Sequence, residues 1–145
     1  MNKEPISTDK APAAVGPYSQ GMKASDFVFT AGQLGLVPGT KDFAGEDIES
    51  QTRQALENLK AVLEAGSSCL EHVIKTTVFL ADMGEFARMN TVYAEFFAMN
   101  PPARSAVEVA ALPLGGRVEI EAIAQRCDCG NGEEDCGCGC DCDCG

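Results

Sequence analysis

Two charged residues between positions 100 and 125 could do chemistry: Arg104 and Glu119. An arginine on a rigid strand can bind a carboxylate through two parallel hydrogen bonds. A glutamate in the same setting can orient a water molecule and accept its proton. Glu108 and Glu121 fall into the same alternating pattern. The alternative for all four charges is therefore a solvated strand face without a chemical role.

The segments that carry these charges are predicted to form a β-hairpin. Apolar residues alternate with polar ones around Val107 and around Ile120, and Leu112–Gly116 has the proline and glycines of a turn. On such a hairpin Arg104 and Glu119 stand roughly 13–20 Å apart along the strands. A small substrate cannot span that distance within one chain. If both residues act on it, they must come from two subunits of a symmetric ring.

Three further residues stand out by type and position. Gly32 interrupts a β-rich run, which indicates either a close approach of a ligand to the backbone or a bulge. Asn90 is a polar residue inside the apolar stripe of a predicted helix, so it either bonds a nearby loop or contacts a ligand. His72, the only histidine, is expected to be a surface or strand-end residue rather than a metal ligand.

The elements that must position these residues follow from hydrophobic periodicity. Residues 1–14 are expected to be a flexible lead-in, and Asp82 and Glu85 are expected to form a capping box. The predicted order is strands at 16–23 and 27–33, a helix at 46–65, a strand at 73–80, a helix at 82–99, and the hairpin at 102–124. This order favours an α+β fold, with a mixed β-sheet and two helices packed on one face.

Composition limits the possible partners. The chain has 145 residues, of which 45% are hydrophobic and 23% charged, and its formal net charge is −11. Such a chain has ample apolar content for a core, and its charge disfavours nucleic acid and anionic membranes. No stretch approaches the length of a membrane span, and the first residues lack an apolar signal core. We therefore expect a cytoplasmic protein.

The cysteines divide the chain into residues 1–125, a conventional domain, and residues 126–145, a tail rich in Cys, Asp and Gly. Dense thiolates favour Zn²⁺, Cu⁺ or Cd²⁺, and the tail is expected to be disordered without metal. The alternative is a solvated tail without bound metal. Cys69 is expected to be a small buried or half-buried residue. The predicted metal ligands are Cys127, Cys129, Cys136, Cys138, Cys140, Cys142 and Cys144.

Several motifs, taken together and in this order, resemble the Rid family (reactive intermediate deaminases of the YjgF type), in particular its RidA branch. The resemblance covers about residues 3–125. The motifs are Gly16-Pro17-Tyr18-Ser19-Gln20, Thr30-Ala31-Gly32-Gln33, Asn90-Thr91-Val92-Tyr93-Ala94-Glu95-Phe96-Phe97, Pro102-Ala103-Arg104-Ser105 and Val118-Glu119-Ile120-Glu121-Ala122-Ile123-Ala124. The resemblance implies a chorismate-mutase-like fold and a homotrimer with active sites in the clefts between subunits.

The resemblance also implies an activity, namely hydrolysis of 2-imino acids and enamines such as 2-aminoacrylate to 2-oxo acids and ammonia, without a cofactor. Carried over residue by residue, Arg104 would bind the substrate carboxylate and Glu119 would activate water. Tyr18 and Asn90 would line the cleft, and the backbone at Gly32 would approach the ligand.

One position departs from the family pattern. Ala106 would lie beside the substrate, where members often have cysteine, so thiol chemistry in the cleft is not expected. The sequence thus predicts a 2-iminobutanoate/2-iminopropanoate deaminase. A metal-buffering or metal-sensing protein on a trimeric Rid scaffold is the second hypothesis, and a ligand-binding trimer without catalysis is the third.

Overall fold

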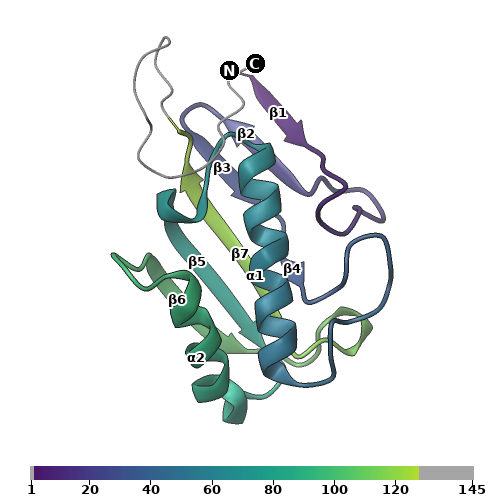
Figure 1. Cartoon of the computed structure of the whole chain (residues 1–145). Helices are drawn as coiled ribbons and strands as arrows, with labels where there is room; N and C mark the ends of the chain where they lie inside the picture. The colour runs from purple at the N-terminus through teal and green to yellow at the C-terminus, as the bar shows by residue number, and fades with distance from the viewer. Residues whose placement is uncertain (1, 128–145) are drawn as a thin grey trace.

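The computed structural model describes residues 2–127 (Figure 1). Within this range the chain forms one mixed β-sheet with two α-helices against one face, as predicted. The helices are α1 (Ile48–Ala65) and α2 (Phe86–Phe96), and short 3-10 turns lie at Leu70–His72, Met83–Glu85 and Pro113–Gly115. The strands are β1 (Lys3–Ile6), β2 (Gly21–Ala24), β3 (Phe27–Thr30), β4 (Gln33–Leu34), β5 (Val73–Leu80), β6 (Ala103–Glu108) and β7 (Val118–Gln125).

The strand order in the sheet is β1-β2-β3-β7-β5-β6, and the short β4 also pairs with β7. All of these pairs are antiparallel except β5 with β6, which is parallel. β5 and β6 are parallel because α2 connects them and returns the chain to the edge of the sheet at which β5 begins. β7 thus occupies the centre of the sheet, and β6 lies at an edge.

The core lies between the sheet and the helices. Alternate residues of β7 point into it, and Val118 and Ile120 are fully buried. Leu59 and Leu63 on the inner face of α1 are buried to the same extent. The intervening residues of β7, which include Glu119 and Glu121, therefore point to the face of the sheet that carries no helix.

Helix α1 begins and ends where its sequence provides caps. The Asp47 carboxylate accepts a hydrogen bond from the Ser50 backbone N–H at 2.9 Å, which satisfies a donor of the first turn. Gly66 ends the helix and donates its N–H to the carbonyls of Val62 and Leu63. The predicted helix and its stop at glycine are confirmed, apart from two residues at the N-terminal end.

The second predicted helix needs correction. Asp82 does cap, but it accepts from the Gly84 N–H at the start of a 3-10 turn rather than of the α-helix. Glu85 pairs with Arg117 at 3.0 Å and does not complete a capping box. Helix α2 ends at Phe96, before the predicted Met99, because Phe97 leaves the helical conformation.

The predicted hairpin is wrong. β5 lies between β6 and β7, and each of them pairs with β5. Residues 109–117 cross over the end of β5, where Val109 N–H bonds Leu80 O and Ala81 N–H bonds Arg117 O. The period-2 pattern of a strand shows that it is half-buried, but it does not identify the neighbouring strand, so it does not distinguish a hairpin from two strands that each pair with a third.

The predicted flexible lead-in is also wrong in part, because Lys3–Ile6 forms edge strand β1 on β2. β1 pairs with β2 through backbone hydrogen bonds, and Ile6 is its one buried residue, so its side chains give little sign of a strand. The strand predicted at 16–23 is confined to Gly21–Ala24. Among residues 2–127, no helix has the length and apolar character needed to cross a membrane. The cytoplasmic location stays a prediction.

Candidate active site

Arg104 of β6 lies against helix α2. Its Nη1 donates a hydrogen bond to Asn90 Oδ1 at 2.7 Å. Its guanidinium carbon lies 5.3 Å from the ring centroid of Phe86 and 4.7 Å from that of Tyr93. Cation–π contacts with two rings and one hydrogen bond fix the half-buried guanidinium in place. Asn90 thus bonds a charged side chain rather than a loop.

The rings that hold Arg104 are themselves fixed. Tyr93 shares a hydrogen bond of 2.7 Å with Thr76 of β5, and its ring centroid lies 4.7 Å from that of Phe97. Burial raises the pKa of the Tyr93 hydroxyl, against the opposing effects of Thr76 and the Arg104 charge, so the hydroxyl is neutral near pH 7. The spacing Phe86-Asn90-Tyr93 places all three side chains on one helix face, and this spacing could have identified both rings as partners of Arg104.

Glu119 of β7 lies over the backbone of Gly32. A Cβ atom at Gly32 would collide with Glu119 Oε1. β3 and β4 also pair with β7 in a broken register, since Phe29 faces Ile123 and Gln33 faces Ile120. One extra residue on the Gly32 side makes this a β-bulge. The bulge predicted as one alternative for Gly32 is therefore confirmed. The group that approaches its backbone is the Glu119 carboxylate, and the approach of a ligand stays a prediction.

The environment of Glu119 favours the protonated form. Burial, and then the nearby Glu121 charge, raises the pKa of the Glu119 carboxyl above its ordinary value. A carboxylate with a raised pKa is a stronger base once it is ionised, which suits proton abstraction from water. Glu108, by contrast, accepts a hydrogen bond from the Met83 N–H at 2.9 Å and so links the end of β6 to the turn before α2.

Tyr18 and Ala106 lie in less constrained surroundings. Tyr18 is 52% exposed and borders a hollow of about 300 Å³ that is lined by the end of β1 and by the loop from β1 to β2, to which Tyr18 itself belongs. That loop enters the sheet beside the bulge, because Gln20 O accepts from the Ala31 N–H at 2.8 Å. Ala106 packs its methyl group against the hydrophobic core on the helix side of β6.

One chain does not bring Arg104 and Glu119 together. Arg104 stands opposite Thr76 in the parallel pair, and Glu119 stands opposite Phe79 on the other side of β5. Two strand spacings and three residue steps place their Cα atoms about 14 Å apart. Arg104 contacts helix α2, whereas Glu119 points to the helix-free face. The hairpin from which their separation was predicted is wrong, but the separation itself remains.

A pocket of about 140 Å³ lies on the helix-free face. Lys75 and Thr77 of β5 contribute to its lining, and neither was predicted as a site residue. Lys75 Nζ donates to Ser105 Oγ at 2.9 Å. The sequence offered little signal for these two residues, because polar residues alternating along a strand usually form a solvated face.

The predicted metal ligands fall mostly outside the described residues. This applies to the six cysteines at 129, 136, 138, 140, 142 and 144. Cys127 is described, and its Sγ lies 3.4 Å from His72 Nδ1. His72 lies directly before β5, which agrees with the expected strand-end position, and its ring lies close to the Cys69 and Cys127 thiols.

Comparison with known proteins decides the family. Residues 8–126 match the family model described as Endoribonuclease L-PSP. The chain belongs to this family. The proteins similar to the chain include a 2-iminobutanoate/2-iminopropanoate deaminase and the YjgF protein of E. coli. The resemblance to Rid proteins of the YjgF type is therefore confirmed for residues 8–126.

Several members are closely similar to the chain. A RutC family protein of Pyrococcus horikoshii is 54% identical over 124 residues, which cover 86% of this chain and 98% of that protein. The 2-iminobutanoate/2-iminopropanoate deaminase of Mus musculus is 47% identical over 119 residues, or 82% of this chain and 88% of the deaminase. The structure of E. coli TdcF with bound serine matches with a TM-score of 0.81 and 43% identity, and covers 85% of this chain and 98% of TdcF.

Proposed function

We propose that this member of the family hydrolyses 2-imino acids and their enamine tautomers, such as 2-aminoacrylate, to 2-oxo acids and ammonia. The observation that carries the proposal is the fixed guanidinium of Arg104, which is suited to holding a carboxylate. Two facts about relatives support it: the mouse protein is named as such a deaminase, and TdcF holds serine, an amino acid with a carboxylate.

The reaction needs little beyond positioning, because an imine carbon is already electrophilic. Water adds to the carbon of the protonated imine while the Glu119 carboxylate accepts one proton of the water, which gives a neutral tetrahedral carbinolamine. Glu119 then passes this proton to the nitrogen. As the carbon–nitrogen bond breaks and the carbonyl forms, the Glu119 carboxylate accepts the proton of the carbinolamine hydroxyl, and ammonia leaves. Arg104 fixes the distance between the carbon and the water by holding the substrate carboxylate. These steps require no cofactor.

We further propose that the working site lies between subunits of a homotrimer, with Arg104 and Glu119 supplied by different chains. The supporting observation is that the two residues lie on opposite faces of one sheet. Phe29, 42% exposed, and Val107, 43% exposed, both lie on the helix-free face, which is suited to burial against another copy. Tyr18, Asn90, Gly32 and Ala106 would border the cleft.

We do not extend the endoribonuclease activity in the family's description to this chain. Its net charge of −11 opposes binding to a phosphate backbone. Metal buffering or sensing stays a second proposed function, and a cluster of possible ligands that includes Cys127 favours it.

The deaminase proposal is tested by replacing the arginine. We expect Arg104→Ala to lower kcat/KM for a freshly generated imino acid by about 10²-fold or more, since an ion pair within a binding site contributes several kcal/mol. The measurement is the initial rate of 2-oxo acid formation. Arg53→Ala is the matched control, because Arg53 pairs with Glu95 on the outer surface and is 51% exposed. Normal turnover by Arg104→Ala would refute the assigned role.

A further inference from the structure

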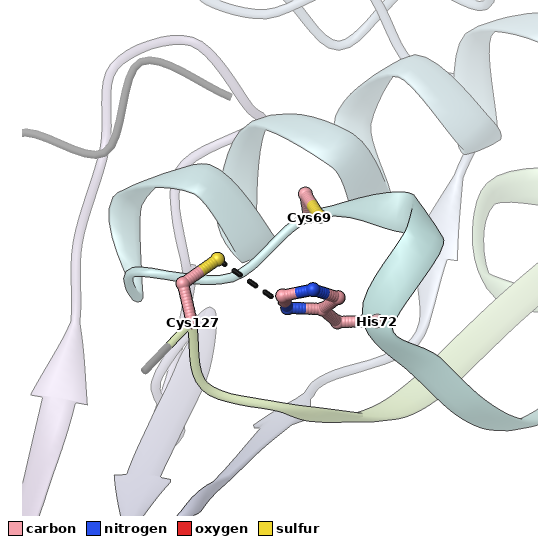
Figure 2. Close-up of side chains that lie close together, drawn as sticks. All are labelled: Cys69, His72 and Cys127. Carbon is pink, nitrogen blue, oxygen red and sulfur yellow. Dashed lines mark hydrogen bonds between the residues drawn. The ribbon is translucent and has the colours of Figure 1, made fainter. Parts of the chain in front are cut away.

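Three potential metal ligands meet at one end of the sheet: Cys69, His72 and Cys127 (Figure 2). Cys69 precedes the Leu70–His72 turn, and Cys127 follows the end of β7. Glu119 lies near the start of β7, so about 26 Å of extended chain separates it from Cys127. The cluster is therefore separate from the proposed active site.

The backbone fixes this cluster independently of any metal. Cys127 donates its N–H to the Ser67 carbonyl at 2.8 Å, and Ser68 Oγ donates to the Gln125 carbonyl at 2.6 Å. These bonds hold the end of β7 against the loop that carries Cys69. On that loop the His72 N–H donates to the Cys69 carbonyl at 3.1 Å, which closes the turn between the two ligands.

The distances suit a tetrahedral metal ion. The ligand atoms of the three side chains all lie within 4.8 Å of one another, and His72 Nδ1 is 3.4 Å from Cys127 Sγ. Around a zinc ion, bond lengths of about 2.3 Å to sulfur and about 2.0 Å to nitrogen place neighbouring ligand atoms about 3.5–3.8 Å apart. Small side-chain rotations are enough to reach that geometry.

We propose that Cys69, His72 and Cys127 form a zinc site in the folded domain. Two thiolates balance the charge of Zn²⁺, which matters because Cys69 is 5% and Cys127 is 9% exposed. Within residues 2–127 these are three protein ligands, and a water molecule or a further thiolate can complete the tetrahedron. The site would link the end of β7 to the loop after α1.

This site differs from the metal binding predicted for the tail, because its ligands are placed by the fold rather than by dense cysteine spacing. It also does not depend on the deaminase proposal. Metal that binds only the ordered site stabilises the native state, so zinc should raise the unfolding temperature.

The test uses the full-length chain with serine at positions 129, 136, 138, 140, 142 and 144, which removes the competing cysteines. The reduced protein is loaded with zinc, desalted and assayed for bound metal, and the ligand field is examined with Co²⁺. We expect one zinc per chain, a visible spectrum typical of tetrahedral thiolate coordination, and a higher unfolding temperature with zinc. Failure of this protein to retain zinc would overturn the proposal.

Single substitutions then assign the ligands. In the same background we expect Cys69→Ala, His72→Asn and Cys127→Ala each to weaken zinc binding by more than about 100-fold, since loss of a group that only hydrogen-bonds a ligand already costs about 10–100-fold. Glu71→Gln is the matched control, because Glu71 lies exposed in the same turn and should not affect zinc retention. Circular dichroism and imine turnover check that each variant is folded.

Two results would count against the site. The first is equal zinc retention by the variant that lacks all three ligands. The second is a disulfide between Cys69 and Cys127 in protein prepared under reductant, because it would consume both thiolates. Neither result would affect the deaminase proposal, which is tested by measuring imine turnover.

Discussion

Arg104 and Glu119 are both charged and half-buried, and their surroundings affect them in opposite ways. Arg104 lies against two aromatic rings and an amide oxygen, all of which favour the cation. Burial disfavours the anion of Glu119, and the charge of the nearby Glu121 carboxylate disfavours it further. The first environment suits permanent binding of an anion, and the second suits transient transfer of a proton.

The raised pKa of Glu119 predicts the acid limb of the pH profile. Glu119 must be ionised to accept a proton, so kcat/KM should fall as the pH drops through its raised pKa. Glu121→Gln removes the neighbouring charge and lowers that pKa. We expect the acid limb of this variant to move to lower pH, but to stay above that of an ordinary glutamate because burial, the larger cause, persists.

The measurement is kcat/KM against pH for the wild type and for Glu121→Gln. Glu57→Gln is the control, because Glu57 is exposed on α1 and should leave the profile unchanged. A shift of the limb to higher pH in Glu121→Gln, or no shift at all, would contradict the role of Glu119 as the base.

The bulge between β3 and β4 is the element that positions Glu119. Without the extra residue, the segment around Gly32 would pair continuously with β7, as β3 does. The bulge interrupts the hydrogen-bond ladder between the strands, and the Ala122 N–H instead donates a hydrogen bond to Thr30 Oγ1 at 3.0 Å. The absence of a side chain at Gly32 then leaves space for the Glu119 carboxylate.

This arrangement predicts an energetic coupling between the two positions. Gly32→Ala should destabilise the protein by about 1–3 kcal/mol, because its Cβ and the Glu119 carboxylate compete for the same space. In the background of Glu119→Ala, where that side chain is truncated, the same substitution should have little effect. Denaturant unfolding of the four proteins gives the coupling energy.

Equal destabilisation in both backgrounds would show that Gly32 is required for another reason, such as backbone conformation. The same variants link stability to turnover. Gly32→Ala should also lower kcat, since displacement of a catalytic group by about 1 Å can lower the rate by about 10²-fold.

At the scale of the whole molecule, one sheet face is covered by helices and the other is not (Figure 1). The uncovered face carries exposed apolar side chains, and edge strand β6 also ends the sheet with unpaired backbone groups on its outer side among the described residues. Both features are ones that association with another copy would bury.

A mixing experiment tests the shared site. Arg104→Ala and Glu119→Gln chains should each be inactive as homotrimers. In trimers formed from equal amounts of both, about one site in four should combine an intact Arg104 from one chain with an intact Glu119 from its neighbour, for statistical reasons. We therefore expect recovery of about a quarter of the wild-type rate after joint refolding.

Lack of any recovery in verified mixed trimers would show that each site uses both residues from one chain. A monomer at working concentration would refute the shared site outright. Sedimentation of the wild type and mass analysis of the mixed assembly give these two answers.

The sequence by itself determined the local elements. Periodicity and caps identified α1 and β5, because these features depend on neighbours within a few residues. It also identified the family, because motifs such as those around Arg104 and Glu119 occur along the chain in the order that is typical of the family. Gly32 and Asn90 could be singled out as candidate site residues for a different reason: each has a residue type that is unusual for its position in a strand or helix pattern.

Only the tertiary structure decided which elements are neighbours. It placed β5 between β6 and β7, brought β1 onto the sheet edge, and set Arg104 against Phe86 and Tyr93. It also brought Cys127 beside His72, which are 55 residues apart in sequence. Strand alternation records which side is buried but not against what, and contacts between distant residues depend on how the packed layers close, which no local pattern contains.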